Sequence, residues 1–295
     1  MNSETKARLL LINSISPGSE FWCEQVAKNG AETVVQGILG NFYYKCNQSI
    51  EKLKFKIRQT DTEAIITKLK SKKTFFIDPQ HELWPITLNR LPNPPIGLLL
   101  KGDIELIGNI KKSISIVGTR KPSSYGLNIA TTFAHELSNF GFTVVSGGAI
   151  GIDTAAHNGA LSAGGKTISI LGSGFEKKFP KSNTSLFNRI EDSGLLISEV
   201  MPEVDPKPNH FLIRNRLIAA LSNGTIVIEA AFKSGSIRTA RDAAELYKPV
   251  MAIPGPINVP TSEGCHRLIT ERCAELVTSV SEVLELVNPL TRMMG

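Results

Sequence analysis

The sequence predicts an α/β fold, in which a small all-helical module precedes a Rossmann-like, doubly wound and mostly parallel sheet. Three observations support this prediction. Apolar runs alternate with segments of helical spacing from residue 113 to residue 253, as they do when helices connect parallel strands. The runs are almost entirely apolar, which is typical of strands covered on both faces. Glycine, serine and proline follow the runs, as turns require.

The first part of the chain predicts short helices, because apolar residues recur at helical spacing on both sides of the turn at residues 16–19. At residues 52–58, lysine and arginine alternate with apolar residues, which fits either a short strand or the flank of a helix. Residues 74–77 and 96–100 are candidate strands. The proline-rich stretch between them excludes a continuous helix.

The remaining elements are expected after residue 112. Strands are predicted at residues 113–117, 142–145, 167–171, 195–198, 225–229 and 250–253, and helices at 124–140, 153–164, 183–193, 211–222 and 236–247. Residues 263–290 are expected to be helical and to pack on this sheet. The predicted organisation is therefore a helical module (1–65), a linker and sheet extension (66–111), the Rossmann-like domain (112–262) and a C-terminal helical segment (263–295).

Composition is that of an ordinary globular protein, with 41% hydrophobic and 20% charged residues. No apolar run approaches the roughly 18 residues that cross a bilayer, and the start of the chain does not read as a signal peptide, so we expect a cytoplasmic protein without membrane insertion. The cysteines (Cys23, Cys46, Cys265 and Cys273) form no CxxC pair. Reduced structural thiols are therefore expected, with no metal or cofactor. The net charge of +6 suits a polyanionic partner without establishing one.

Small and polar residues follow the predicted strands. In a parallel sheet these turns converge on the carboxyl edge, where open α/β folds bind ligands. Glycines allow a close approach to a ligand, although they also make simple tight turns, and free amides at a helix start favour anions. Arg120 beside a glycine turn can clamp a phosphate. The candidate phosphate-binding residues at these turns are Gly118, Thr119, Arg120, Ser146, Gly147, Gly148, Ala149, Ser234, Gly235 and Ser236.

Further basic residues accompany these turns. Arg214 and Arg216 lie two apart on a predicted helix, so we expect one to face a ligand and the other to pair with a carboxylate such as Glu199 or Glu229. Lysines interleaved with phenylalanines at residues 175–181 suit single-stranded nucleic acid, although a solvated loop fits equally well.

Catalytic patterns are scarce. Asp153 and His157 are one helical turn apart and fit either a base with its orienting group or, as we favour, a hydrogen bond at a helix start. The sequence contains no GxSxG, HExxH or GxxxxGK[ST] motif, and the first turn is not GxGxxG.

Together these motifs resemble the DNA-processing protein A (DprA/Smf) family over about residues 70 to 275. The resemblance rests on Val-Gly-Thr-Arg (117–120), Ser-Gly-Gly-Ala-Ile-Gly-Ile-Asp (146–153), Phe-Pro (179–180) with Asn183, Arg-Asn-Arg (214–216) and Ser-Gly-Ser (234–236). The helices before residue 65 resemble the sterile-alpha-motif-like module at the start of this family. The sequence departs from the family pattern at Leu212, Arg238 and Cys273, and its end at Gly295 suggests that the winged-helix domain of many members is absent.

The resemblance implies a non-catalytic protein that binds and protects single-stranded DNA and helps to load the RecA recombinase during natural transformation. It implies a homodimer or larger assembly, an extended Rossmann domain, and DNA contacts from the strand-end residues, with Lys178, Lys181 and Asn183 beside them. The alternative is a nucleotide-binding or nucleoside-phosphate-hydrolysing enzyme similar to the lysine-decarboxylase-like group, with Glu229 or Glu199 as general base. The Pro-Gly-Gly-x-Gly-Thr loop of that group is missing.

Overall fold

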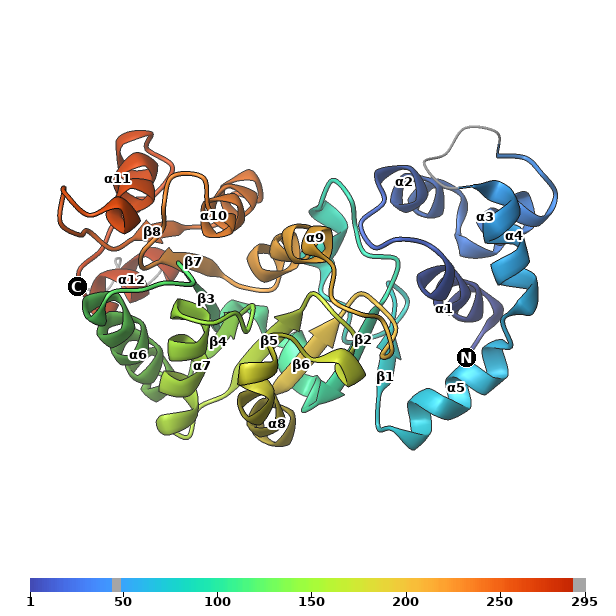
Figure 1. Cartoon of the computed structure of the whole chain (residues 1–295), viewed down its shortest axis with the longest axis horizontal. Helices are drawn as coiled ribbons and strands as arrows, with labels where there is room; N and C mark the ends of the chain where they lie inside the picture. The colour runs from blue at the N-terminus through green and yellow to red at the C-terminus, as the bar shows by residue number, and fades with distance from the viewer. Residues whose placement is uncertain (44–48, 289–295) are drawn as a thin grey trace.

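The computed structural model describes residues 1–43 and 49–288 as a mixed α/β protein (Figure 1). Within these residues nine strands form one sheet in the order β1-β2-β6-β5-β4-β3-β7-β8-β9. The strands are β1 (Phe75–Ile77), β2 (Leu98–Gly102), β3 (Ser113–Val117), β4 (Thr143–Ser146), β5 (Thr167–Leu171), β6 (Leu195–Ser198), β7 (Gly224–Val227), β8 (Val250–Ala252) and β9 (Glu275–Leu276). The predicted Rossmann-like fold is confirmed.

The direction of the chain through the sheet reverses beside β3. Strands β3 to β9 pair with one another in parallel, whereas β2 pairs antiparallel with β6 and β1 pairs antiparallel with β2. From β3 the chain adds β4, β5 and β6 on one side, and then β7, β8 and β9 on the other. The carboxyl ends of β3 and β7 therefore flank the topological switch point, where open α/β sheets have their binding crevice.

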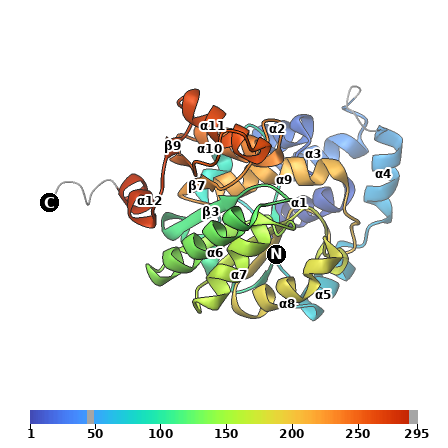
Figure 2. The same cartoon turned by 60° about the vertical axis from the view of Figure 1, so that its left-hand side comes forward.

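Helices cover both faces of the sheet. On one face lie α6 (Ser124–Asn139), α7 (Ile152–Ser162), α8 (Thr184–Ser193) and α12 (Val280–Val287), and on the other α9 (Pro208–Ala220), α10 (Gly235–Glu245) and α11 (Glu263–Thr270) (Figures 1 and 2). Alternate residues of each strand enter different cores, so that Ile114 and Ile116 pack with α6 while Val117 packs with α9 and α10. This two-sided burial explains the continuous apolar runs.

Residues 263–290 are not wholly helical, which corrects one prediction. Between α11 and α12 the chain forms β9, which pairs in parallel with β8 through Met251–Glu275 and Ala252–Leu276. Both β9 side chains are exposed, so no buried period marks the strand. Pairing supplies hydrogen-bond partners to the edge of β8, an interaction that acts through the backbone and leaves no side-chain pattern.

Five short helices lie within residues 1–43 and 49–71, and one of them settles an alternative left open by the sequence. They are α1 (Ser3–Ser14), α2 (Glu20–Asn29), α3 (Ala31–Leu39), α4 (Ile50–Gln59) and α5 (Thr62–Ser71). The alternating basic row at residues 52–58 is therefore helical and lies in α4. The predicted division after residue 65 falls inside α5. The apolar core of these helices is continuous with Leu99 and Leu196 of the sheet and with Phe187 of α8.

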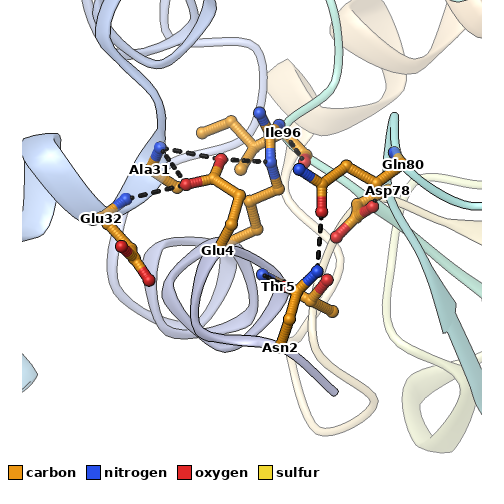
Figure 3. Close-up of polar contacts among 9 residues, drawn as sticks. Asn2, Glu4, Thr5, Ala31, Glu32, Asp78, Gln80 and Ile96 are labelled. Carbon is orange, nitrogen blue, oxygen red and sulfur yellow. Dashed lines mark hydrogen bonds and ion pairs between the residues drawn. The ribbon is translucent and has the colours of Figure 1, made fainter.

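Polar contacts also tie α1 to the rest of the molecule (Figure 3). The Glu4 carboxylate accepts the Ala31 amide at 2.9 Å and the Glu32 amide at 3.0 Å, at the uncapped start of α3. The Arg8 guanidinium donates to Glu4 at 2.8 Å and to the Ile96 carbonyl at 3.0 Å. Glu4 thus caps one helix and orients the arginine that holds the sheet extension.

No helix in the described part of the chain is long and apolar enough to cross a membrane. The cysteines that the structure describes, Cys23, Cys265 and Cys273, are free thiols. Cys46 lies outside the described residues.

Candidate anion-binding pocket

A pocket of about 550 Å³ lies at the switch point between β3 and β7. Four segments form most of its wall: the turn after β3, the turn between β4 and α7, helix α9 and the start of α10. Among the predicted phosphate-binding residues, the structure brings these to its wall: Gly118, Thr119, Arg120, Ala149, Arg214, Ser234, Gly235 and Ser236.

The turn after β3 is fixed by backbone contacts, and its arginine is free. The Thr119 amide donates to the Glu229 carbonyl at 2.6 Å, and the Ile152 amide donates to the Thr119 carbonyl at 3.2 Å. A Cβ on Gly118 would lie 2.6 Å from Ile152 Cγ1, so glycine is needed for this close approach. The exposed Arg120 side chain has no hydrogen bond or ion pair with any described residue. Its guanidinium is therefore available to a ligand at the mouth of the pocket.

The glycine turn after β4 is held from behind by three side chains. Arg214 Nη1 donates to the Gly147 carbonyl at 2.5 Å, and Asn183 Nδ2 donates to the Gly148 carbonyl at 3.1 Å. The Asp153 carboxylate accepts the Ala149 amide at 3.3 Å. The Ala149 amide therefore already has a carboxylate of the protein as its acceptor. Gly147 and Gly148 are buried behind the pocket wall and do not line the pocket.

Arg214 places a positive charge beneath the pocket. Its side chain is buried, and its Nε has no hydrogen-bond partner among the described residues. Burial lowers the pKa of Arg214 to about 10, so the guanidinium stays charged at neutral pH. Burial also raises the pKa of Asp153, although the Arg214 charge and the Ala149 amide oppose this shift. A fixed cation at the pocket floor favours an anionic ligand.

The start of α10 adds an anion-binding feature. Its N-cap, Ser234, makes no side-chain capping bond, while Ser236 Oγ donates to the Gly118 carbonyl at 2.7 Å and ties this start to the β3 turn. Asn215 Nδ2 donates to the Gly235 carbonyl at 3.1 Å. The first amides of a helix carry partial positive charge, so an uncapped start beside Arg120 suits a phosphate.

The other predicted basic residues lie away from the pocket wall. Arg216 is 8% exposed and forms an ion pair with Glu199 at 2.7 Å, which confirms the prediction that one of the two arginines pairs with a carboxylate. Lys178 bonds Asn188 at 2.9 Å and Glu191 at 2.8 Å. Lys181 is exposed but does not line the pocket. Ser146 is buried and donates to the Ile116 carbonyl at 2.7 Å.

Sequence reasoning missed the apolar side of the pocket, formed by Phe211 and Leu212. Leu212 is 61% exposed, and the Phe211 ring lies 5.5 Å from that of Phe179. Phe211 precedes Arg214 by three residues and therefore shares its helix face, a spacing that was available from the sequence. Phe211 is half-buried and Phe179 is 43% exposed. Accessible aromatic rings beside cations suit the stacking of unpaired bases.

The candidate catalytic groups are engaged elsewhere. His157 Nδ1 lies 2.7 Å from Thr167 Oγ1, which donates onward to the Val144 carbonyl, so the ring proton is assigned to Nδ1. Burial and then the Arg214 charge lower the pKa of His157 to about 3, too low for a general base near neutral pH. Asp153 and His157 do not bond each other.

The two carboxylates proposed as bases in the alternative enzyme are also occupied. Glu229 accepts the Ser123 amide at 2.9 Å and its hydroxyl at 2.6 Å, at the start of α6. Glu199 pairs with Arg216. Neither carboxylate lines the pocket. Across the described residues, no group of three or more His, Cys, Asp or Glu side chains is arranged to hold a metal ion.

The protein is thus an α/β protein with a Rossmann-like sheet and a cationic pocket at the switch point of that sheet. The particular family follows from comparison: residues 75–288 match the model of DNA recombination-mediator protein A, and the chain belongs to that family. It is 41% identical to the DNA processing protein DprA of Streptococcus pneumoniae over 203 residues, and this aligned stretch covers 69% of this chain and 71% of that protein. A relative from Mycobacterium tuberculosis is 38% identical over 201 residues, and the chain spans only 51% of its length.

Solved structures show the same architecture. The X-ray structure of DprA from Streptococcus pneumoniae superposes on this chain with a TM-score of 0.82 at 33% identity. The superposition covers 96% of this chain and 98% of the Streptococcus pneumoniae chain. DprA from Helicobacter pylori superposes with a TM-score of 0.66 at 30% identity, over 75% of this chain and 97% of its own. That second structure was described for its mode of binding single-stranded DNA.

Proposed function

We propose that this chain binds single-stranded DNA across the switch-point pocket. The observation that carries the proposal is the free Arg120 guanidinium, which stands beside the uncapped start of α10 and above the buried charge of Arg214. Phosphates would meet Arg120 and the α10 amides, and bases would meet Phe211 and Leu212. Membership of the recombination-mediator family and the DNA-binding mode described for the Helicobacter pylori relative support this assignment.

We further propose that the chain acts without catalysis, as a cytoplasmic homodimer that protects DNA and assists RecA loading in natural transformation. Partners within the protein hold the side chains of Glu199, Glu229 and His157 through an ion pair or hydrogen bonds. This favours a binding role over hydrolysis of a nucleotide, which would need a free general base. The RecA and dimer assignments rest on family membership.

Fluorescence anisotropy with labelled oligo-dT tests the pocket. Because a hydrogen bond to a charged group contributes about 1.5–3 kcal/mol, Arg120→Ala should weaken binding by about 10-fold or more. Lys111→Ala is the matched control, since Lys111 is exposed just before β3, at the opposite edge of the sheet. Wild-type affinity should fall with salt at a log–log slope of about −0.7 per phosphate contacted. Binding that is equally affected by both variants, or competed fully by a mononucleotide, would refute the proposal.

A further inference from the structure

Most of the net positive charge of the chain is concentrated in two helices of the N-terminal module. Residues 50–73, which include α4 and α5, contain eight lysines and arginines and three acidic residues, a net charge of +5. The whole chain has a net charge of +6. A local excess of this size attracts polyanions, and none of it belongs to the switch-point pocket.

One face of α4 combines cations with an exposed aromatic ring. Lys52, Phe55 and Lys56 have the spacing that places side chains on one helix face, and Phe55 is 68% exposed. Neither lysine forms an ion pair within 4.0 Å of another described residue. Leu53 and Ile57, 3% and 5% exposed, form the buried side of the helix.

Folding does not explain this face. Like charges at positions i and i+4 destabilise a helix by a few tenths of a kcal/mol, and Lys52 in the first turn opposes the helix dipole. Phe55 lies outside the core that Leu53 and Ile57 join. Cations with an exposed ring between them are the combination that binds single strands without sequence preference, because bases stack on the ring while phosphates meet the charges.

The α4 face is connected to the pocket by the start of α9. Burial lowers the pKa of Lys56, the Glu203 carboxylate opposes this shift, and the Lys207 charge adds to it, so Lys56 lies near both residues. Lys207 is the exposed N-cap of α9, and Phe211 of the same helix lines the pocket one turn later. The end of α9 that begins at Pro208 faces the helical module in both views (Figures 1 and 2).

The loop before α9 is also held against the module. Lys68 of α5 forms an ion pair at 3.2 Å with Glu203 of this loop, so the loop before α9 lies against α5. The path from Phe211 in the pocket therefore leads past Lys207 at the start of α9 to Lys56 of α4, with the Glu203 carboxylate also close to Lys56.

We propose that single-stranded DNA leaving the switch-point pocket passes Lys207 and continues onto α4, where Lys52 and Lys56 contact phosphates and a base stacks on Phe55. This inference rests on the proposed function of the pocket. It assigns the helical module a direct part in binding the strand.

Strand length separates the two surfaces. Oligo-dT of about 6 nucleotides should occupy the pocket alone, whereas about 30 nucleotides should reach α4 as well. With the long strand, Lys52→Gln with Lys56→Gln should make the log–log salt slope shallower by about 1.4, because two phosphate contacts are lost. Phe55→Ala should weaken long-strand binding by about 5-fold or more, since stacking contributes about 1–3 kcal/mol per base. Neither change should affect the short strand.

The matched control is Lys111→Gln with Lys112→Gln, which removes the same charge from two exposed residues at the opposite edge of the sheet. If that control changes the slope equally, a general charge effect replaces the α4 contact. An unchanged slope in the α4 variant overturns the inference, and leaves the pocket assignment intact if Arg120→Ala still weakens both strands. Loss of binding to vesicles of anionic phospholipid, with DNA binding unchanged, would also overturn it and identify a membrane surface instead.

Discussion

Replacing Arg216 tests whether the two arginines of α9 have separate roles. Arg216 and Glu199 are 8% and 9% exposed and lie 2.7 Å apart, so Arg216→Met leaves a buried carboxylate without its partner. Removing one member of a buried ion pair costs about 3–5 kcal/mol. Domains have total stabilities of about 5–15 kcal/mol, so the variant should lose a large part of its stability yet retain a folded population. The intact pocket of that population should still bind DNA.

Urea unfolding and oligo-dT binding distinguish this role from DNA contact. Adding Glu199→Leu to Arg216→Met should recover most of the lost stability, because apolar replacements of a buried pair are often neutral or stabilising. Arg120→Met should give the opposite result, with stability changed by less than about 0.5 kcal/mol and DNA binding weakened by about 10-fold or more. If Arg216→Met unfolds at the wild-type urea concentration but fails to bind oligo-dT, the structural role assigned to Arg216 is wrong.

Two pH-dependent predictions follow from other charged groups. Partial burial alone would raise the pKa of Glu4, but the Ala31 amide and the Arg8 guanidinium outweigh it and lower the pKa. Glu4→Gln should therefore lower the free energy of unfolding, measured with urea at pH 7, by about 1 kcal/mol. This difference between variant and wild type should vanish as the pH falls through the lowered pKa of Glu4. A difference that is independent of pH would contradict the capping role. Lys248 donates to three carbonyls at and beyond the end of α9, and burial, then the Arg90 charge, lowers its pKa to about 8. As the pH rises, the folded state thus releases this proton before the unfolded state does. The stability of the wild type relative to Lys248→Met should therefore rise by up to about 3 kcal/mol between about pH 8 and pH 10.5. A difference in stability that does not change with pH would refute this prediction.

The sheet was predictable because burial on both faces leaves a strong sequence signal. The predicted strands 113–117, 167–171 and 195–198 coincide with β3, β5 and β6. β9 was missed because two exposed residues joined through their backbone carry no such signal. The basic row of α4 was ambiguous because its short alternation of charged and apolar residues fits either period.

The pocket was predictable only as a set of converging turns. Their position follows from the parallel sheet, and the separation of Arg214 from Arg216 follows from helix geometry. Which groups are free to bind depends on tertiary contacts that no local pattern encodes. The sequence indicated Lys178 and Asn183 as candidate DNA contacts. In the structure Lys178 forms an ion pair with Glu191, and Asn183 donates a hydrogen bond to the Gly148 carbonyl.

The glycine turn after β4 shows why this distinction matters for recognition. In many phosphate sites such a turn offers its amides to the ligand. Here Asp153 accepts the Ala149 amide, so a carboxylate of the chain already occupies one of these donors. Attraction for an anion must then come from Arg120, Lys121, the start of α10 and the Arg214 charge. Arg120 and Lys121 are exposed and line the pocket, and neither side chain has a hydrogen bond or ion pair within the described residues. We therefore expect these two cations to contribute most to affinity for an anion, while the buried glycines shape the pocket wall.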